Sequence, residues 1–396
     1  MQENNTIKTS EAKCTIHFLP AKAGDCLVVE LDNKSCILID TGYSLTYKEE
    51  LKPLLQKLAQ KGCKISLMIV THIDKDHISG AISFLEENGD ALRPKIIQVD
   101  EIWHNGIFNT VMHSELFLKH KADELPEELL SKYRSARGLL KKQLQGPCGM
   151  ISVPQSRTFE SLCGKYHYNV NGKAEGKWIG RNQHYKLGDC EIQVLSPGIA
   201  EIENLQKILD SELTRKFGKD YLWNRTDAFA ELVELIALYQ GRDKAGSFTM
   251  KQISAGAGSI EEWLGTSGLA KMNEINCASI VVTILYKGRK LLFMGDSESE
   301  LWKDQLEPHY DLIKVSHHGT TKPNLAWMEC TQADKLLIST NGGKHGHPED
   351  EFLARAMLGP FGELYFNYNI WRKPTILAMQ EKYHFKAAFE KREIFL

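Results

Sequence analysis

The chain has 396 residues, 42% of them hydrophobic and 25% charged, which is the composition of a globular protein without a biased tract. The 49 Lys and Arg residues are balanced by 51 Asp and Glu residues, so the net charge of −2 excludes binding of nucleic acid through overall charge alone. Nine cysteines without a C-x-x-C pair disfavour disulfides and zinc fingers, and the polar N-terminus and short apolar runs predict a cytoplasmic protein that does not enter a membrane.

The first hundred residues alternate between strand and helix patterns. Short β-prone runs are separated by turn residues, and other segments carry apolar residues at helical spacing. Such alternation favours an α/β fold built in layers. The predicted strands are 15–19, 26–31, 35–39, 66–70 and 95–99, and the predicted helices are 48–60 and about 77–89.

The middle of the chain has a different character. Residues from about 108 to 147 and from about 201 to 240 are helical in pattern and rich in charge. Strand patterns return after residue 280, so the middle interrupts one fold and does not begin a second one. We therefore predict a single domain over residues 1–396, with helical or loop insertions at 106–183 and 199–272.

A run of potential metal ligands follows the predicted strand at 66–70. His72, Asp74, Asp76 and His77 lie within six residues of one another, directly after this apolar strand. Burying four such side chains is costly unless a cation pairs with them. Imidazole with carboxylate suits zinc, and additional carboxylate favours harder ions such as manganese. The alternative interpretation is a polar turn in which Asp76 caps the following helix.

Three other predicted strands also end in residues of ligand type. One ends at Asp296, a second at His317 and His318, and a third at Asp40. Side chains at several strand ends meet at one edge of the sheets, where α/β proteins bind their ligands. Because neighbouring residues of a strand face opposite ways, we expect only one of the two adjacent histidines to be a ligand.

The order of these motifs resembles the metallo-β-lactamase superfamily, whose signature is H-x-H-x-D-H and whose fold is an αββα sandwich. Here Asp74 replaces the second histidine, and the resulting H-x-D-x-D-H is similar to the nuclease-like domain of ComEC-type competence DNA-uptake proteins and their stand-alone relatives. The resemblance covers about residues 13–105 and 184–380. It implies two mixed β-sheets flanked by helices, with metals at one end of the sheets. Further matching residues are Gly24-Asp25, Asp40-Thr41-Gly42, Asn276, Ser279, Gly295-Asp296, His317-His318-Gly319, Asn341 and His347-Pro348.

One motif of the family is harder to place in this sequence. The family's third motif is a histidine that follows a later strand. His104 comes shortly after the predicted strand at 95–99 and is our candidate. His113 and His184 are the alternatives, and an ordinary interior position is the competing interpretation of His104.

The resemblance implies two divalent ions, Zn or Mn, that share a water activated for attack. Behind them, Asp25 and Asp40 are expected to orient the ligands or the loop. His318 and His347 are expected close to the substrate, whereas Lys322 is better explained as a solvated surface lysine. The predicted ligands are His72, Asp74 and His104 for one ion, Asp76, His77 and His317 for the other, and Asp296 as the bridge; the predicted catalytic residues are Asp76, His318 and His347.

The leading functional hypothesis is hydrolysis of a phosphodiester in DNA, RNA or a nucleotide. It rests on the subgroup resemblance and on a dinuclear site that suits anions. The Lys and Arg residues at 132–142 would fit a nucleic-acid groove, although a solvated helix face is the simpler interpretation. Two alternatives stay open, which are an ester, lactone or thioester hydrolase, and a partner-gated effector of a bacterial defence system whose insertions dock on another protein.

Overall fold

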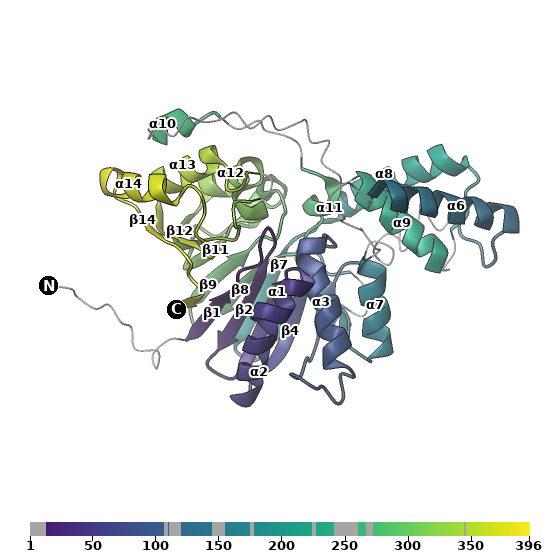
Figure 1. The fold of residues 1–396 in the computed structure, drawn as a ribbon, viewed down its shortest axis with the longest axis horizontal. Helices are drawn as coiled ribbons and strands as arrows, with labels where there is room; N and C mark the ends of the chain where they lie inside the picture. Colours follow the sequence, from purple (N-terminus) through teal and green to yellow (C-terminus); the bar gives the residue numbers. More distant parts are fainter. Residues whose placement is uncertain are drawn as a thin grey trace.

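The computed structural model describes residues 13–106, 110, 120–144, 155–174, 178–223, 227–240, 260–266, 272–343 and 346–396. Two mixed β-sheets form its centre, and helices cover the outer face of each (Figure 1). The α/β fold class predicted from the alternation of elements and the αββα layers implied by the family resemblance are thereby confirmed.

The first sheet is built from the N-terminal part of the chain and is completed by its last strand. The strand order is β15-β1-β2-β3-β4-β5. The pairs from β15 to β3 are antiparallel, whereas β3, β4 and β5 run parallel, so their carboxyl ends lie at one edge. The strands are β1 (Cys14–Phe18), β2 (Cys26–Leu31), β3 (Ser35–Thr41), β4 (Lys64–Val70), β5 (Ile102–His104) and β15 (Glu393–Phe395).

The second sheet comes from the C-terminal half of the chain. Its order is β14-β13-β12-β11-β9-β8-β7-β6, and β10 pairs with β12. The strands from β9 to β14 are parallel, and those from β6 to β9 are antiparallel. The strands are β6 (His184–Leu187), β7 (Cys190–Ser196), β8 (Val281–Tyr286), β9 (Arg289–Phe293), β10 (His309–Tyr310), β11 (Leu312–Lys314), β12 (Gln332–Ile338), β13 (Phe361–Phe366) and β14 (Lys386–Ala388).

Central strands are buried on both faces, because each sheet lies between the other sheet and a layer of helices. In β2, Leu27 and Val29 belong to the core between the sheets, whereas Cys26 and Val28 pack under the helices of the first sheet. This double burial explains why the strand sequences are almost continuously apolar. The cysteines of the described residues are free thiols, and most are buried.

Helices form the two outer layers, and short helical turns connect the strands. None of the described helices combines the length and the apolar character needed to cross a membrane. The helices over the first sheet are α1 (Ser44–Thr46), the π-helix η1 (Tyr47–Leu51), α2 (Lys52–Gln60), α3 (Lys75–Asn88) and α7 (Gln155–Lys165); those over the second are α10 (Ile260–Trp263), α12 (Thr321–Cys330), α13 (Asp350–Leu358) and α14 (Lys373–Tyr383). The short connections are α11 (Glu274–Cys277), η2 (Gly172–Ala174), η3 (Ser299–Leu301), η4 (Lys303–Gln305) and η5 (Ser316–Gly319).

Three further helices stand beside the sandwich, on the right of Figure 1. They are α6 (Glu127–Leu144), α8 (Ile199–Phe217) and α9 (Asp227–Gln240), and we call them the helical unit. Their apolar faces share a core of their own, in which Tyr133, Leu209 and Phe229 are fully buried. Both sequence regions predicted as insertions contribute to this unit.

Two details differ from the sequence-based expectation. The strand predicted at 95–99 is wrong, because Asn88 Oδ1 accepts hydrogen bonds from the Ile96 and Ile97 amides and thereby removes them from sheet pairing. Val99 forms an isolated parallel bridge with Ile65 of β4, and the strand that continues this pairing is β5, a few residues later. In addition, α7 lies inside the region 106–183 but packs against the first-sheet core through Phe159, so part of this region belongs to the sandwich.

The close contact between α3 and β3 gives a test of the packing. A Cβ added to Gly80 would lie 2.2 Å from the Thr41 carbonyl oxygen, whereas one added to the helical Gly138 would meet nothing within 4 Å. We expect Gly80→Ala to lower the free energy of unfolding by roughly 1–3 kcal/mol or more through overpacking. Gly138→Ala should raise it by up to about 1 kcal/mol through helix propensity. Urea unfolding of both variants measures the difference, and equal effects would contradict this packing.

Candidate metal centre

The run predicted to bind metal lies between β4 and α3. The strand β4 ends at Val70, and Thr71 and His72 follow directly after it. Asp74 is the N-cap residue of α3, but its side chain makes no capping hydrogen bond. Its carboxylate is therefore available for other contacts, and Oδ2 lies 3.7 Å from His72 Nε2. Asp76 and His77 occupy the first turn of α3, which directs them toward the same end of the sheets.

Asp40 fixes this run through hydrogen bonds to Thr71 and His77. It is fully buried at the end of β3, with a left-handed φ of 52°. Its carboxylate accepts hydrogen bonds from the Thr71 amide at 2.8 Å, the Thr71 hydroxyl at 2.7 Å and His77 Nδ1 at 2.7 Å. With Nδ1 donating to Asp40, the lone pair of His77 Nε2 faces the opposite side.

The second sheet supplies Asp296, three residues after Phe293 at the end of β9. Gly295 has a left-handed φ of 51°, and a Cβ there would lie 3.1 Å from Thr71 Cβ and 3.3 Å from Ser279 Cβ. The glycine therefore allows the two sheets to approach closely at this point. Asp296 is consequently placed beside His72 and His77 although more than two hundred residues separate them in the chain.

His317 and His318 also reach this point, from the turn after β11. We expected them to face opposite ways as neighbours on a strand, and this premise is wrong. Both residues adopt left-handed backbone conformations, with φ of 43° and 58°, in the turn η5. Their Nε2 atoms lie 3.7 and 3.8 Å from Asp296 Oδ2. His318 Nδ1 donates to the Ser339 carbonyl oxygen at 2.9 Å, so its Nε2 is the atom free to act as a ligand.

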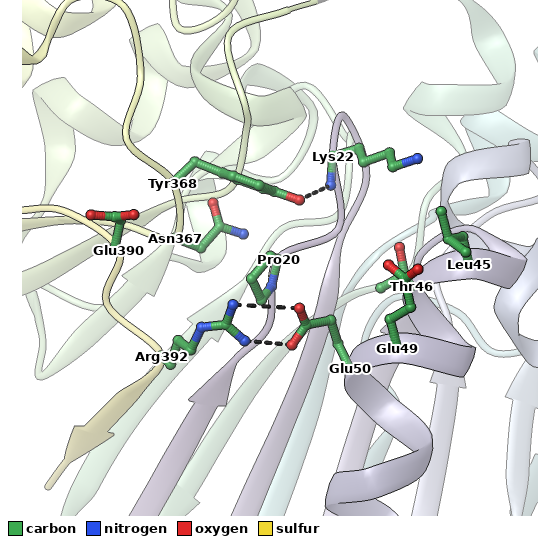
Figure 2. A pocket seen from close by; sticks show the side chains of 10 residues that line it. All are labelled: Pro20, Lys22, Leu45, Thr46, Glu49, Glu50, Asn367, Tyr368, Glu390 and Arg392. Atoms are coloured by element: carbon green, nitrogen blue, oxygen red, sulfur yellow. Dashed lines mark hydrogen bonds and ion pairs between the residues drawn. The ribbon is translucent and has the colours of Figure 1, made fainter.

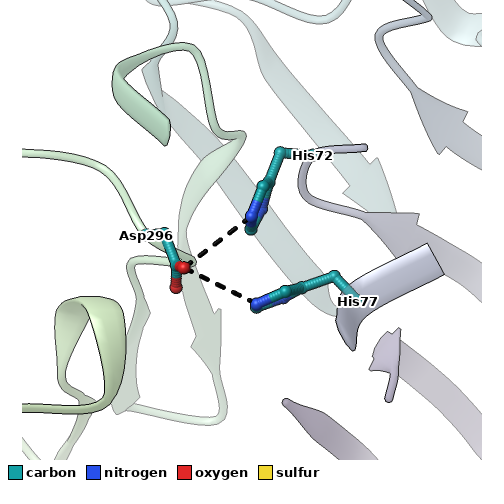
Figure 3. Close-up of side chains that lie close together, drawn as sticks. All are labelled: His72, His77 and Asp296. Atoms are coloured by element: carbon teal, nitrogen blue, oxygen red, sulfur yellow. Dashed lines mark ion pairs between the residues drawn. The ribbon is translucent and has the colours of Figure 1, made fainter. Parts of the chain in front are cut away.

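Four imidazoles thus surround one carboxylate oxygen. His72 Nε2 and His77 Nε2 each lie 3.7 Å from Asp296 Oδ2, as Figure 3 shows, and the two histidines of η5 lie at nearly the same distance. These separations are too long for hydrogen bonds. Two ligand atoms bound at about 2.1 Å to one ion in tetrahedral geometry are about 3.4 Å apart, which is close to what is observed. The spacing is therefore that of ligands around shared cations.

The unsatisfied atoms of the site support the same interpretation. Within the described part of the chain, His72 Nε2, His77 Nε2 and Asp296 Oδ1 are buried and have no hydrogen-bond partner. Leaving such atoms unpaired costs about 1–3 kcal/mol each, and more where they are charged. Burial by itself would raise the pKa of Asp296, but the surrounding imidazoles outweigh it and hold that pKa well below its usual range. A carboxylate kept ionised among imidazole nitrogens is a suitable cation ligand.

The ligand atoms divide into overlapping groups. His72, His77 and Asp296 form one group whose atoms lie within 4.8 Å of one another. Asp76, His77 and His318 form a second group with the same spacing. His77 belongs to both groups, and Asp296 Oδ2 lies 3.7 Å from His77 Nε2 and 3.8 Å from His318 Nε2, so the residues present fit two neighbouring ions. The predicted ligands His72, Asp74, Asp76, His77, Asp296 and His317 are all brought together here, and His318 joins them.

Asp25 lies behind His318 as part of a buried ion pair. Its Oδ2 is 2.5 Å from Lys314 Nζ, and both side chains are almost fully buried. Its Oδ1 is 3.6 Å from His318 Nδ1. Asp25 precedes β2 of the first sheet and Lys314 belongs to β11 of the second, so this pair joins the two sheets beneath the site.

His104 does not reach this group of ligand atoms. It is buried at the end of β5, where its Nε2 lies 3.0 Å from Ser156 Oγ and its ring packs edge-on against Phe159. The alternative candidate His184 lies exposed on β6, at the edge of the second sheet. His113 lies outside the described residues. Neither His104 nor His184 therefore joins the ligand atoms around Asp296, whereas His317 Nε2 lies 3.7 Å from Asp296 Oδ2.

His347 borders the site, and Lys322 has an acidic neighbour. The His347 ring lies 5.3 Å from that of His317 and 6.4 Å from that of His318, and it is 7% exposed. The Lys322 ammonium lies 3.6 Å from Glu298. His347 is therefore the better placed of the two to meet a group bound at the metal ligands.

Three neighbours of the site were not identified from the sequence. Lys314 is a buried cation within an apolar strand, and this contrast was the signal that could have revealed it. Burial, followed by the charges of Asp76 and Asp74, raises the pKa of Tyr43, which places this phenol next to the ligand run. Ile73, between two predicted ligands, is buried in the core of the helical unit, and no local pattern in the sequence indicates this.

The basic residues of α6 are largely neutralised by acidic neighbours. This arrangement corresponds to the solvated-face interpretation and gives little support to a basic groove on this helix. The ion pairs are Lys132 with Glu128, Arg134 with Glu127, and both Arg137 and Lys141 with Glu231.

Part of the chain that forms this site is similar to a known protein family. Residues 19–141 match the family model described as the metallo-beta-lactamase superfamily, and this segment contains the whole run from His72 to His77. Together with the two mixed sheets and their helical layers, the match assigns the metallo-β-lactamase fold to this chain. No curated protein matches the chain.

Several solved structures are similar over most of the chain. The metallo-beta-lactamase fold protein YhfI of Bacillus subtilis is 8% identical with a TM-score of 0.39, covering 97% of this chain and 99% of its own. Zn²⁺-bound PqqB of Methylobacterium extorquens is 10% identical with a TM-score of 0.40, covering 96% and 100%. CmlA, a diiron beta-hydroxylase of Streptomyces venezuelae, is 9% identical with a TM-score of 0.37, covering 97% and 54%. These TM-scores and identities are too low to indicate the function of this chain.

Removal of the central carboxylate tests the metal centre. Asp296→Ala takes away the oxygen that all four imidazoles surround, so we expect a clear loss of bound metal. Elemental analysis of the purified chain measures this, with Asp334→Ala, at an exposed aspartate paired with His309, as the matched control. An unchanged metal content in Asp296→Ala would overturn the assignment of this residue.

The buried His104 gives a pH-dependent prediction. Burial lowers the pKa of its imidazole from 6.5 to about 4. The unfolded chain therefore takes up this proton near pH 6.5, whereas the folded chain resists it until about pH 4. The free energy of unfolding should fall by up to about 3 kcal/mol as the pH decreases through this window, because the unfolded state binds more protons there.

Urea unfolding at pH 7 and pH 5 measures this contribution. We expect His104→Gln to flatten the pH dependence relative to the unmodified chain, with His184→Gln as the control for loss of an exposed imidazole. Identical slopes in the unmodified chain and His104→Gln would show that His104 is not held neutral.

Proposed function

We propose that this chain is a dinuclear metal-dependent hydrolase that acts on phosphodiesters. The observation that supports this most strongly is the arrangement of four imidazole nitrogens at 3.7–3.8 Å around Asp296 Oδ2. Such a site suits two divalent cations, zinc or manganese. When bound, two such ions lower the pKa of a water and stabilise negative charge on the substrate.

The proposed ligand set differs in part from the one expected from the sequence. His318 takes the place beside Asp76 and His77, because these three form one compact group. His317, whose Nε2 lies 3.7 Å from Asp296 Oδ2 as that of His72 does, is proposed to join His72 and Asp74 in place of His104. Asp296 lies between the two groups and is proposed to bridge them.

The protein's own residues orient this site and border the substrate. Asp40 fixes the ring of His77 through Nδ1, and the Ser339 carbonyl group fixes His318 in the same way. The buried pair of Asp25 and Lys314 fills the space behind His318 without exposing either charge to water. His347, beside the His317 ring, is proposed to donate a proton or hydrogen bond to the leaving group.

The choice of a phosphodiester follows from the H-x-D-x-D-H run and its resemblance to ComEC-type nuclease-like domains. An ester, lactone or thioester hydrolase is the alternative that the same metal pair permits. The partner-gated effector has a specific observation in its favour, because Ile73 of the ligand run is buried in the core of the helical unit. A protein docked on that unit would therefore act on the ligand run through direct packing. We propose that the enzyme works in the cytoplasm.

A substrate panel with the purified chain tests this proposal. With added Mn²⁺ or Zn²⁺ we expect hydrolysis of at least one among plasmid DNA, single-stranded DNA, RNA and bis(p-nitrophenyl) phosphate, and none of p-nitrophenyl acetate. His347→Ala should reduce kcat by roughly a hundredfold, the contribution of a positioned proton donor, while retaining bound metal. Lys322→Ala, which removes a partner of Glu298, is the matched control and should change kcat little. Cleavage of the acetate alone would favour the ester hydrolase, and inactivity with metal bound would favour the partner-gated effector.

A further inference from the structure

A tryptophan lies exposed near the metal centre. Trp371 is 53% exposed, whereas Trp103, Trp302 and Trp327 are fully buried. An indole ring exposed to water lacks the hydrophobic stabilisation that burial would give it. An orientation fixed by neighbouring side chains would indicate that this ring serves as a contact surface.

Trp371 is held in place by its neighbour in the chain. The guanidinium carbon of Arg372 lies 3.9 Å from the centre of the Trp371 ring and 4.8 Å from that of Trp263 on α10. Arg372 is 7% exposed and forms an ion pair with Asp350 at the start of α13. Because Arg372 covers one face of the Trp371 ring and is itself fixed, the ring has a defined orientation and one face left for another contact.

The indole also lies against the loop that leads to the metal centre. A Cβ added to Gly342 would be 2.9 Å from Trp371 Cδ1 and 3.7 Å from the His347 carbonyl oxygen, so the ring edge touches the backbone of this loop. The His347 ring is 5.3 Å from that of His317, whose Nε2 is 3.7 Å from Asp296. Trp371 is thus connected to Asp296 by three intervening residues, Gly342, His347 and His317.

A pocket lined by Asn367 and Tyr368, which shortly precede Trp371 in the chain, is a less suitable place for a polyanion. It has a volume of about 280 Å³ and lies between Lys22, Tyr368 and the helix that carries Glu49 and Glu50, as Figure 2 shows. Glu49, Glu50 and Glu390 contribute three carboxylates, and Arg392 is paired with Glu50. The backbone of a phosphodiester chain is therefore disfavoured in this pocket.

We propose that Trp371 stacks on a base of the substrate, so that the substrate class is a base-bearing phosphodiester, a nucleic acid or nucleotide. Indole rings bind bases of any sequence by stacking, and a guanidinium behind the ring strengthens the platform. The base would lie on the free face of Trp371 while its neighbouring phosphate reaches the ligands around Asp296. This inference rests on the proposed phosphodiesterase function. It adds recognition of the base, because the metal ligands contact only the phosphate and cannot distinguish a nucleotide from another phosphodiester.

Binding to oligonucleotides with and without bases provides the test. The probes are a fluorescein-labelled decamer of deoxyadenylate and a fluorescein-labelled decamer of abasic tetrahydrofuran nucleotides. Fluorescence anisotropy of the metal-loaded chain measures binding, and gel electrophoresis of each sample confirms that the probe is intact at the time of reading. We expect the unmodified chain to prefer the deoxyadenylate probe. Trp371→Ala should weaken its binding about tenfold, as expected for the loss of one stacked base, and leave the abasic probe unchanged. Trp371→Phe should largely restore binding, and Leu377→Ala, at another exposed apolar position, should have no effect.

The outcomes separate this inference from the proposed function. Equal binding of both probes by the unmodified chain, or an equal loss for both probes in Trp371→Ala, overturns the stacking role. Thermal unfolding of Trp371→Ala and Trp371→Phe shows whether a loss comes from misfolding, and Trp371→Phe then decides. If the base-dependent binding is found but no phosphodiester is hydrolysed, the stacking role stands and the proposed activity fails. If hydrolysis is found and Trp371→Ala changes neither binding nor KM for deoxyadenylate, only the stacking role fails.

Discussion

The structure depends on one buried carboxylate among four imidazoles. Asp296 is 3% exposed, and its oxygen lies 3.7–3.8 Å from ring nitrogens of His72, His77, His317 and His318. At this separation the groups cannot hydrogen-bond to one another, and burial removes the water that would otherwise solvate them. A cation between them resolves both problems. The rest of the fold can be understood as the means of bringing these groups together and holding them until an ion binds.

The contacts that assemble the site run between the two sheets. Gly295 brings the end of β9 in the second sheet against Thr71, which follows β4 of the first sheet, since a Cβ at this glycine would lie 3.1 Å from Thr71 Cβ. The pair of Asp25 and Lys314 crosses the same boundary. If one partner of a buried ion pair is removed, the other charge is left buried without compensation, which is strongly unfavourable. Such pairs therefore specify how the sheets align more than they add stability. The site is therefore a product of sheet-to-sheet packing and not of any single segment.

This origin explains how much could be predicted from the sequence. The run from His72 to His77 was recognisable because its ligands are close together in the chain and follow an apolar strand. Asp296 was recognisable for the same reason at the end of β9. The relation between His317 and His318 was not, because a left-handed turn reverses the alternation that a strand imposes. His104 could not be placed either, since its hydrogen bond to Ser156 depends on where α7 docks. Local patterns determine strand ends, whereas ligand identity depends on packing between distant segments.

The helical unit touches the site by two separate routes. Ile73, between His72 and Asp74, is 3% exposed and belongs to the core of this unit. On a second route, Glu234 of α9 accepts hydrogen bonds from the Ser156 and Arg157 amides at 2.8 and 3.0 Å, and burial raises its pKa to about 8. Since Ser156 also contacts His104, which pairs with Val70 at the carboxyl end of β4, α9 is linked to the segments just before and just after His72. A shift of α9 relative to the sandwich must therefore disturb packing on either side of His72. This is a physical reason to regard the helical unit as part of the catalytic architecture and not as a passive insertion.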